Sequence, residues 1–109
     1  MTKYKLVVLT NAVEGHEQAF NDWYDNTHLG DVLKIQDFTA AKRFKSVVPV
    51  MGEPFYGYCA IYDVETDNPE KAIERLTSAW GTPVMEMSDA LAPQMYAVLY
   101  QEHGALPKV

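Results

Sequence analysis

Four runs of apolar and β-branched residues along the chain predict four strands. The first run, residues 3–10, alternates only weakly between apolar and polar positions, which is typical of a strand covered on both faces. We expect the second strand over about 37–48, the third over about 55–65 and the fourth over about 94–102. In the second strand, one predicted face carries Phe38, Ala40, Lys42 and Phe44, and the other carries Thr39, Ala41, Arg43 and Lys45.

The third strand has two different sides. Alternation places Phe55, Gly57, Cys59 and Ile61 on one side, and Tyr56, Tyr58, Ala60 and Tyr62 on the other. Three tyrosines on one side of a single strand are too many for an ordinary solvated face. We therefore expect these tyrosines either to pack on another subunit or to line a pocket.

A helix is predicted over residues 14–28, between the first and second strands. Its apolar stripe, at helical spacing, consists of Phe20, Trp23, Tyr24, Thr27 and His28. The start of this segment lacks a strong capping residue, and Gly30 is expected to end the helix. An apolar stripe that finishes in a phenol and an imidazole suggests that this helix holds something besides a core.

A second helix begins after the third strand. Either Asp67 or Asn68 serves as its cap, and Pro69 occupies the first turn, where the missing N–H costs nothing. Its expected buried stripe is Ala72, Ile73, Leu76 and Trp80. Residues 84–93 are expected to form a short helical turn that packs Met85, Met87 and Leu91 against the body of the domain.

The resulting order, β-α-β-β-α-β, is the ferredoxin-like arrangement. It predicts one α+β domain over residues 1–109, with a four-stranded antiparallel sheet and both helices on one of its faces. The other face is not polar, because apolar or aromatic residues occur on both sides of the first, third and fourth strands. A second copy of the same sheet would cover it most simply, so we predict a homodimer.

Composition narrows the class of protein. The net charge of −6 argues against a nucleic-acid partner or an anionic membrane surface. The chain shows neither an apolar run of about 18 residues nor a signal-peptide pattern at its start. Cys59 is the single cysteine, so no internal disulfide and no cysteine-based metal cage can form. We expect a cytoplasmic protein.

The candidate chemistry centres on His28. An imidazole with an ordinary pKa near 6.5 can accept and return a proton near neutrality, although a histidine can also simply cap the end of a helix. Tyr24, four residues earlier, could orient the imidazole or donate to a substrate oxygen. Asp31 or Asp25 could fix the imidazole tautomer. Trp23 is expected to pack against the sheet, with substrate contact as the alternative.

Further binding residues are expected on the strands. Arg43 and Lys42 lie on opposite faces, and an inward Arg43 would anchor a carboxylate or an enolate, whereas an interfacial salt bridge is the alternative. Candidate pocket residues for an aromatic or polyketide-like ligand are Tyr58, Tyr62, Trp80 and Met85. The three histidines, His16, His28 and His103, lack the spacing of a catalytic metal site, so we expect neither metal nor cofactor.

These residues resemble a known superfamily. The segment from Phe20 to Phe44 is similar to the dimeric α/β-barrel superfamily, particularly its EthD-like branch, through the pattern Trp23-Tyr24, His28-Leu29, Asp31-Val32-Leu33, Phe38, Ala41 and Arg43-Phe44. The resemblance implies a ligand cleft between the sheet and the helices of one subunit. EthD-like relatives usually carry proline at the position of Gly30, and this departure affects the fine geometry after His28.

Members of this superfamily include quinol monooxygenases, muconolactone isomerases, polyketide cyclases and ligand-sensing domains. The resemblance implies a cofactor-independent enzyme that acts by acid/base chemistry on a small cyclic, aromatic or polyketide-like oxygenated metabolite, as an isomerase, cyclase or lyase. Such a role belongs to aromatic catabolism or secondary metabolism. One alternative is a cofactor-free quinol-type monooxygenase, and another is a non-catalytic small-molecule-binding or accessory protein.

Overall fold

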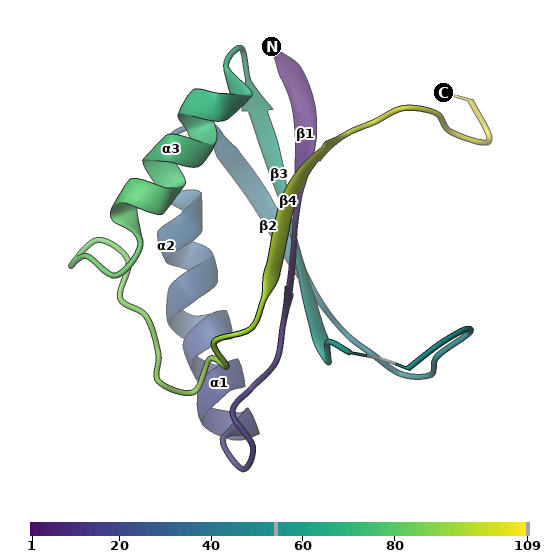
Figure 1. Cartoon of the computed structure of the whole chain (residues 1–109). Coiled ribbons are helices and arrows are strands. Elements are labelled where there is room, and N and C mark those ends of the chain that lie inside the picture. Colours follow the sequence, from purple (N-terminus) through teal and green to yellow (C-terminus); the bar gives the residue numbers. More distant parts are fainter. Residues whose placement is uncertain (54, 109) are drawn as a thin grey trace.

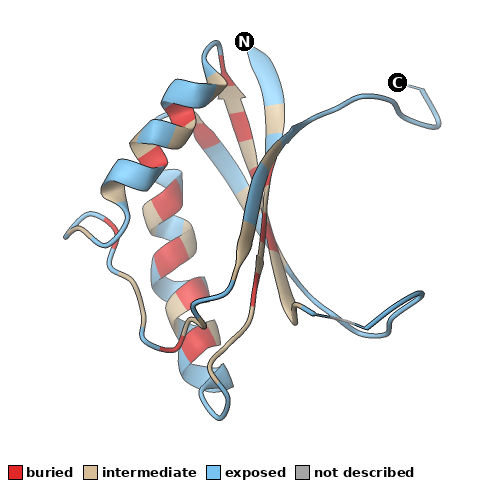
Figure 2. Cartoon of the chain, in the orientation of Figure 1, coloured by how far each residue is buried: buried red, intermediate tan, exposed pale blue. Residues whose placement is uncertain are grey.

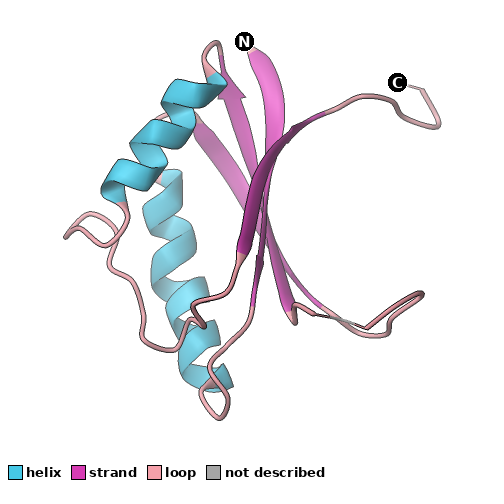
Figure 3. Ribbon diagram, in the orientation of Figure 1, coloured by secondary structure: helices cyan, strands magenta, loops and turns pink. Residues whose placement is uncertain are grey.

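The computed structural model describes residues 1–53 and 55–108 and consists of one sheet with helices on one side. In chain order the elements are β1 (Thr2–Thr10), α1 (Glu17–Trp23), the π-helical turn η1 (Tyr24–His28), α2 (Leu29–Leu33), β2 (Phe38–Lys45), β3 (Tyr58–Thr66), α3 (Pro69–Ala79) and β4 (Tyr96–Gln101) (Figure 3). All strand pairs are antiparallel, in the order β2-β3-β1-β4. This topology confirms the ferredoxin-like prediction.

The first helical region (α1, η1 and α2) and α3 both pack on the same face of the sheet (Figure 1). Burial alternates along β3 from Cys59 to Thr66. The buried residues of the sheet and of the helices form one core between these two layers, and Figure 2 shows where they lie along the ribbon. The largest fully buried side chains in that core are Tyr24, Tyr62, Phe20, Met85, Val32 and Val64. In the single chain β1 is covered on one face only, contrary to our prediction, because both helices lie on that face.

We call the opposite side of the sheet the outer face. Its centre carries Val7, Leu9, Ile61 and Val98, and its edge near the N-terminus carries Lys3, Lys5, Asp63 and Glu65. The loop between β2 and β3 and the C-terminal tail both extend on this side of the sheet (Figure 1). None of the helices among the described residues is long and apolar enough to cross a membrane.

A bulge in β2 decides which way its side chains point. The register with β3 shifts between Phe38 and Ala40, so Thr39 is an extra residue in the ladder. Phe38 consequently faces the helices together with Ala41 and Arg43, and it is buried. Our prediction that Phe38 shares a face with Lys42 was wrong, because simple alternation contains no bulge.

The first helical region is longer than predicted. It begins at Glu17 and runs through α1, η1 and α2 to Leu33, so Gly30 lies inside a helix and does not end it. Gly30 is exposed, and a Cβ placed there would meet nothing within 4 Å among the described atoms. A solvent-facing glycine weakens a helix by only about 1 kcal/mol, which the packing of Val32 on the core outweighs.

The second helix agrees with its sequence signals up to its last residue. The Asn68 side chain accepts a hydrogen bond from the backbone N–H of Lys71 at 3.1 Å, and Pro69 occupies the first turn. Trp80 follows the end of α3, where it is 40% exposed, so it does not complete the buried stripe that we expected.

The predicted helical turn over 84–93 does not form. Residues 80–95 instead make an extended connection, here called the α3–β4 segment, which crosses from α3 past α1 to β4 (Figure 1). Its backbone pairs with residues 11–13, through bonds from Val13 N–H to the Ala90 carbonyl (2.8 Å) and from Ala92 N–H to the Asn11 carbonyl (2.9 Å). One local turn bond, from Leu91 N–H to the Ser88 carbonyl (3.2 Å), is present within residues 84–93, but the long-range bonds to residues 11–13 hold the rest of this segment and no helix forms.

Candidate functional site

The π-helical turn brings two aromatic rings, those of Trp23 and Tyr24, against His28. At this wider spacing a residue lies beside the one five positions earlier, so His28 stacks on Trp23 with ring centroids 4.5 Å apart. Tyr24, four positions earlier, meets the imidazole edge-on at 5.0 Å. A regular α-helix would bring only the second of these partners close. Single-turn π segments frequently occur at functional sites.

His28 faces a small enclosed cavity between the helices and the sheet. The cavity volume is about 40 Å³. Its lining side chains come from β1, the first helical region, β3, α3, the α3–β4 segment and β4, and they are Leu6, Val8, Trp23, Tyr24, His28, Val32, Tyr62, Leu76, Trp80, Leu91, Met95 and Ala97. This hollow lies between the sheet and the helices, where the family resemblance implies a ligand cleft, but it has room for only about one water molecule.

The imidazole of His28 is kept neutral by its surroundings. Its side chain is buried, and Nδ1 has no hydrogen-bond partner within residues 1–53 and 55–108. Burial lowers the pKa of His28 to about 4; Asp31 opposes this shift, whereas the positive charge of Arg43 adds to it. At neutral pH the group is a neutral imidazole, which can accept a proton.

Two buried phenols share the cavity with this imidazole. The hydroxyl of Tyr62 is buried, and it too lacks a hydrogen-bond partner among the described residues. Burial raises the pKa of Tyr62, and the neighbouring Tyr24 phenol raises it further. Burial likewise raises the pKa of Tyr24, although Arg43 opposes that shift. Both phenols therefore keep their protons at neutral pH and can donate hydrogen bonds to a guest.

Arg43 points toward the helices but does not reach the cavity. Its guanidinium donates to the Asp25 carboxylate at 2.7 Å and to the Asn21 side-chain oxygen at 2.8 Å. It also stacks over the Tyr24 ring, 4.3 Å from the centroid. We expected Arg43 to anchor a substrate or to form an interfacial salt bridge. In this structure both of its partners lie on the first helical region of the same chain.

The other predicted site residues separate into two groups. Trp23 and Trp80 line the cavity, and the Trp23 indole N–H donates to the Glu86 carbonyl at 3.1 Å. Tyr58 and Met85 do not line it. Tyr58 accepts a hydrogen bond from the Asn21 side chain of α1 at 3.2 Å and lies beside Arg43, and Met85 is fully buried in the core.

Asp31 does not fix the imidazole in the way that we expected. Its carboxylate lies 3.6 Å from the Lys34 ammonium, one helical turn away. Asp25 is committed to Arg43. Neither carboxylate bonds to Nδ1 of His28, so the influence of Asp31 on this group is its charge alone.

Several lining residues escaped the sequence analysis. Leu6 and Val8 could have been found from the alternation of β1. Asn21 lies outside the cavity and holds Arg43, a role that its position four residues before Asp25 on one helix face could have indicated. Leu91 was expected to pack against the body of the domain but not to line a pocket, and Met95 was not predicted at all, because the long-range pairing of residues 11–13 with the α3–β4 segment positions both.

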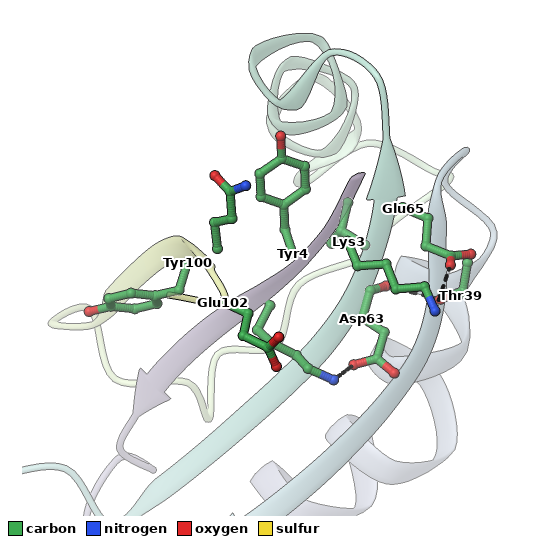
Figure 4. A pocket seen from close by; sticks show the side chains of 10 residues that line it. Lys3, Tyr4, Thr39, Asp63, Glu65, Tyr100 and Glu102 are labelled. Atoms are coloured by element: carbon green, nitrogen blue, oxygen red, sulfur yellow. Dashed lines mark hydrogen bonds and ion pairs between the residues drawn. The ribbon is translucent and has the colours of Figure 1, made fainter. Parts of the chain in front are cut away.

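A larger hollow lies on the outer face of the sheet (Figure 4). Its volume is about 750 Å³, and both signs of charge line it. Lys3 pairs with Glu65 at 3.7 Å, and Lys5 pairs with Asp63. These ion pairs between neighbouring strands are exposed and contribute little to stability, and we interpret the hollow as part of the outer face rather than as a reaction site.

Comparison with known structures identifies the fold. The chain is similar to an EthD family protein of Bacillus halodurans C-125, with 20% identity, a TM-score of 0.56 and coverage of 94% of this chain and 100% of that chain. A candidate monooxygenase of Shewanella loihica PV-4 gives 10% identity and a TM-score of 0.64 over 95% and 97% of the two chains. A Dabb family protein of Mesorhizobium loti MAFF303099 gives 10% and 0.60 over 95% and 100%. The chain thus has the ferredoxin-like fold of EthD and Dabb family proteins, which confirms the resemblance at the level of the fold.

In sequence, the chain is similar to core atranone cluster (CAC) protein 1 of Stachybotrys chlorohalonatus. The two are 31% identical over 90 residues, which cover 76% of this chain and 37% of the relative. The chain therefore matches little more than a third of the length of that relative. No family model matches the chain.

Proposed function

We propose that this protein is a cofactor-independent enzyme that acts by acid/base chemistry on a small cyclic, aromatic or polyketide-like oxygenated metabolite, as an isomerase, cyclase or lyase. One observation carries the proposal. A neutral imidazole, whose Nδ1 lacks a hydrogen-bond partner among the described residues, shares one enclosed hollow with the phenols of Tyr24 and Tyr62. Buried polar groups left in this way are costly, so an arrangement of this kind is best explained by a guest that pairs with them.

The proposed reaction begins with proton removal from a carbon next to a carbonyl. His28 takes that proton as general base, and the electron pair moves onto the carbonyl oxygen to give an enolate. Tyr24 and Tyr62 donate hydrogen bonds to this oxygen, and His28 returns the proton at the product carbon. A positioned base contributes about 10²–10⁴-fold, and donors aimed at the developing oxyanion contribute a further 10²–10³-fold or so.

The lining of the cavity indicates the class of substrate. Apart from the imidazole, the lining residues that the structure describes are apolar or aromatic, and none of them is charged at neutral pH. The Trp23 and Trp80 indoles offer flat surfaces for a ring. A flat, uncharged, oxygenated molecule fits this chemistry. Similarity to a protein named for a fungal atranone cluster supports a substrate from secondary metabolism.

Substrate entry requires the cavity to widen. A volume of about 40 Å³ accommodates roughly one water molecule, whereas ligand sites usually measure about 300–1,000 Å³. The α3–β4 segment supplies Trp80, Leu91 and Met95 to the lining, and it lies outside the helices and strands. We propose that this segment moves outward to admit the ligand, with the partly exposed Trp80 at the opening.

A general probe can test the base without knowledge of the natural substrate. 2-Tetralone is a flat, neutral aromatic ketone whose protons next to the carbonyl exchange with deuterium in heavy water, and proton NMR follows this exchange. We expect the protein to accelerate the exchange and the His28→Ala variant to lose about 10²-fold or more of that acceleration. His16→Ala, which removes an exposed histidine, is the matched control. Equal acceleration by the His28→Ala variant would remove His28 from the mechanism.

A quinol-type monooxygenase is the second candidate, and it is favoured by the similarity in fold to a candidate monooxygenase. The bound quinol would itself reduce O₂, with His28 accepting the phenolic proton. Conversion of a hydroquinone that stops under nitrogen, together with 2-tetralone exchange at the background rate, would select this alternative. Saturable binding of both probes without conversion of either would instead select a binding or accessory protein.

We also propose that the protein is a homodimer joined through the outer faces of two sheets. The accessible surface is 7584 Å², compared with about 6,100 Å² for a typical monomer of this mass. The excess exceeds the roughly 800 Å² that one partner contributes to a standard interface. Apolar residues at the centre of the outer face, including Val98, and on the β2–β3 loop are exposed in the single chain.

A further inference from the structure

We infer that Arg43 is a positioning residue for Tyr24: held by Asp25 and Asn21, it supports the Tyr24 ring from the side away from the cavity and acts on a bound ligand only through that ring. For the part that concerns the ligand, this inference rests on the proposed function. The contacts themselves belong to the structure and can be tested separately.

The guanidinium is held at two points on one helix face. Asn21 and Asp25 are four residues apart, so their side chains lie one turn from each other and receive the two terminal nitrogens of Arg43. Arg43 itself comes from β2 and reaches this face because of the bulge at Thr39. The planar fork of arginine suits this two-point attachment better than the ammonium of lysine does.

The same guanidinium lies over a cluster of aromatic rings. It is 4.3 Å from the Tyr24 ring centroid and 5.4 Å from the centroids of Phe20 and Tyr58. The Arg43 side chain is only 13% exposed, so solvent screens its charge poorly. Tyr24 therefore has a fixed cation on one side and the cavity on the other.

Two observations separate this role from direct binding of a ligand. Arg43 is absent from the residues that line the cavity, whereas Tyr24 is among them. Both terminal nitrogens of Arg43 are already engaged by Asp25 and Asn21. A ligand in the cavity would therefore meet the hydroxyl of Tyr24, and the charge of Arg43 would reach the ligand through that phenol.

The charge acts when Tyr24 shares its proton with a ligand oxygen. Negative charge then builds on the phenol oxygen, and burial opposes this charge. The groups facing Tyr24 are Tyr62 and Cys59 from β3, His28 from the same helical turn, and Arg43 from β2. The first three are uncharged at neutral pH, so Arg43 supplies the stabilising positive charge.

The test places 3,5-difluorotyrosine, a more acidic phenol, at position 24 and follows its titration by fluorine NMR while the protein stays folded. Arg43→Gln should weaken the acidity of this phenol by about tenfold or more, as expected for loss of an adjacent opposite charge. Lys42→Gln removes a cation from the next residue, on the outer face, and should leave the titration unchanged. Equal titration curves for the Arg43→Gln and Lys42→Gln proteins would overturn the inference.

Arg43→Lys gives a second, milder test in case the glutamine variant does not fold. It keeps the charge but loses the fork, so the acidity should stay within about threefold while the fluorine line broadens or splits as the ring gains freedom. A line as sharp as that of the parent protein would contradict the positioning role. Failure of the 2-tetralone assay alone would overturn the proposed function and leave these titrations unaffected, so the two failures can be told apart.

Discussion

At the residue scale, the cost of burying a charged imidazole determines the protonation state of His28. A histidine at the surface would carry a charge during part of the physiological pH range, whereas this one remains neutral because burial lowers its pKa to about 4. The stacking of Trp23 and the edge of Tyr24 replace water around the ring. The result is a base that stays available, enclosed beside two proton-bearing phenols.

This shift makes the stability of the fold depend on pH. Between pH 6.5 and about 4 the unfolded chain takes up a proton on His28 that the folded chain does not, so stability falls as the pH is lowered through this window. The loss amounts to roughly 3 kcal/mol. Urea unfolding at pH 6.5 and at pH 4 measures the free energy of unfolding. Between these two pH values we expect it to fall by roughly 3 kcal/mol less in His28→Gln than in the parent protein. Parallel pH profiles of the two proteins would show that His28 titrates normally when folded.

At the element scale, the first helical region and the α3–β4 segment build the site together. The apolar spacing of the chain was enough to predict that Tyr24 and His28 lie side by side, and the capping residues predicted α3 well. The π turn, and with it the stacking of Trp23 on His28, could not be predicted, because only packing of the whole helix against the sheet favours the wider turn. The bulge at Thr39 likewise depends on its pairing with β3.

The α3–β4 segment is a clearer case of a structure that local sequence patterns do not predict. Met85, Met87 and Leu91 were correctly predicted to pack against the domain, but a helical turn was predicted for them because the backbone partners of this segment at residues 11–13 lie far away in the sequence. Sequence patterns report local periodicity, whereas this segment is positioned by long-range hydrogen bonds. The residues that close the cavity are therefore the ones that the sequence predicted least well.

If the α3–β4 segment admits the ligand, Trp80 should control the opening. Trp80→Ala removes a partly exposed indole from the lining, so we expect faster association of phenol and a loss of roughly 1–3 kcal/mol of stability. Stopped-flow fluorescence of the remaining Trp23 would measure the rate. Val84→Ala, at an exposed position of the same segment, is the control. An association rate equal to that of the control variant would place the entrance elsewhere.

At the scale of the whole molecule, the single chain is less compact than a typical chain of its length. The radius of gyration is 14.7 Å, whereas a compact chain of this length has about 13 Å. The β2–β3 loop and the C-terminal tail both extend past the outer face (Figure 1), which makes the chain open on that side. A second copy seated on this face would close it.

If the dimer forms through the outer face, a charge placed on that face should prevent dimer formation, whereas a charge placed on the helix side should not. Val98→Asp places a charge on the outer face and should convert the dimer to a monomer, because an unpaired charge is costly in an apolar interface. Val84→Asp makes the same change in the α3–β4 segment, on the helix side, and should leave the dimer intact. Light scattering after size-exclusion chromatography distinguishes the two masses. A parent protein that elutes as a monomer would end the proposal.

The central claim is that a neutral, buried imidazole faces a cavity that receives an aromatic oxygenated guest. Nitrogen-15 NMR of labelled His28 during a titration with 2-tetralone tests this claim most directly. We predict the signals of a neutral imidazole at pH 6, and a saturable shift of those signals as the ketone binds. Signals of a protonated imidazole at that pH, unchanged by the ketone, would contradict the account.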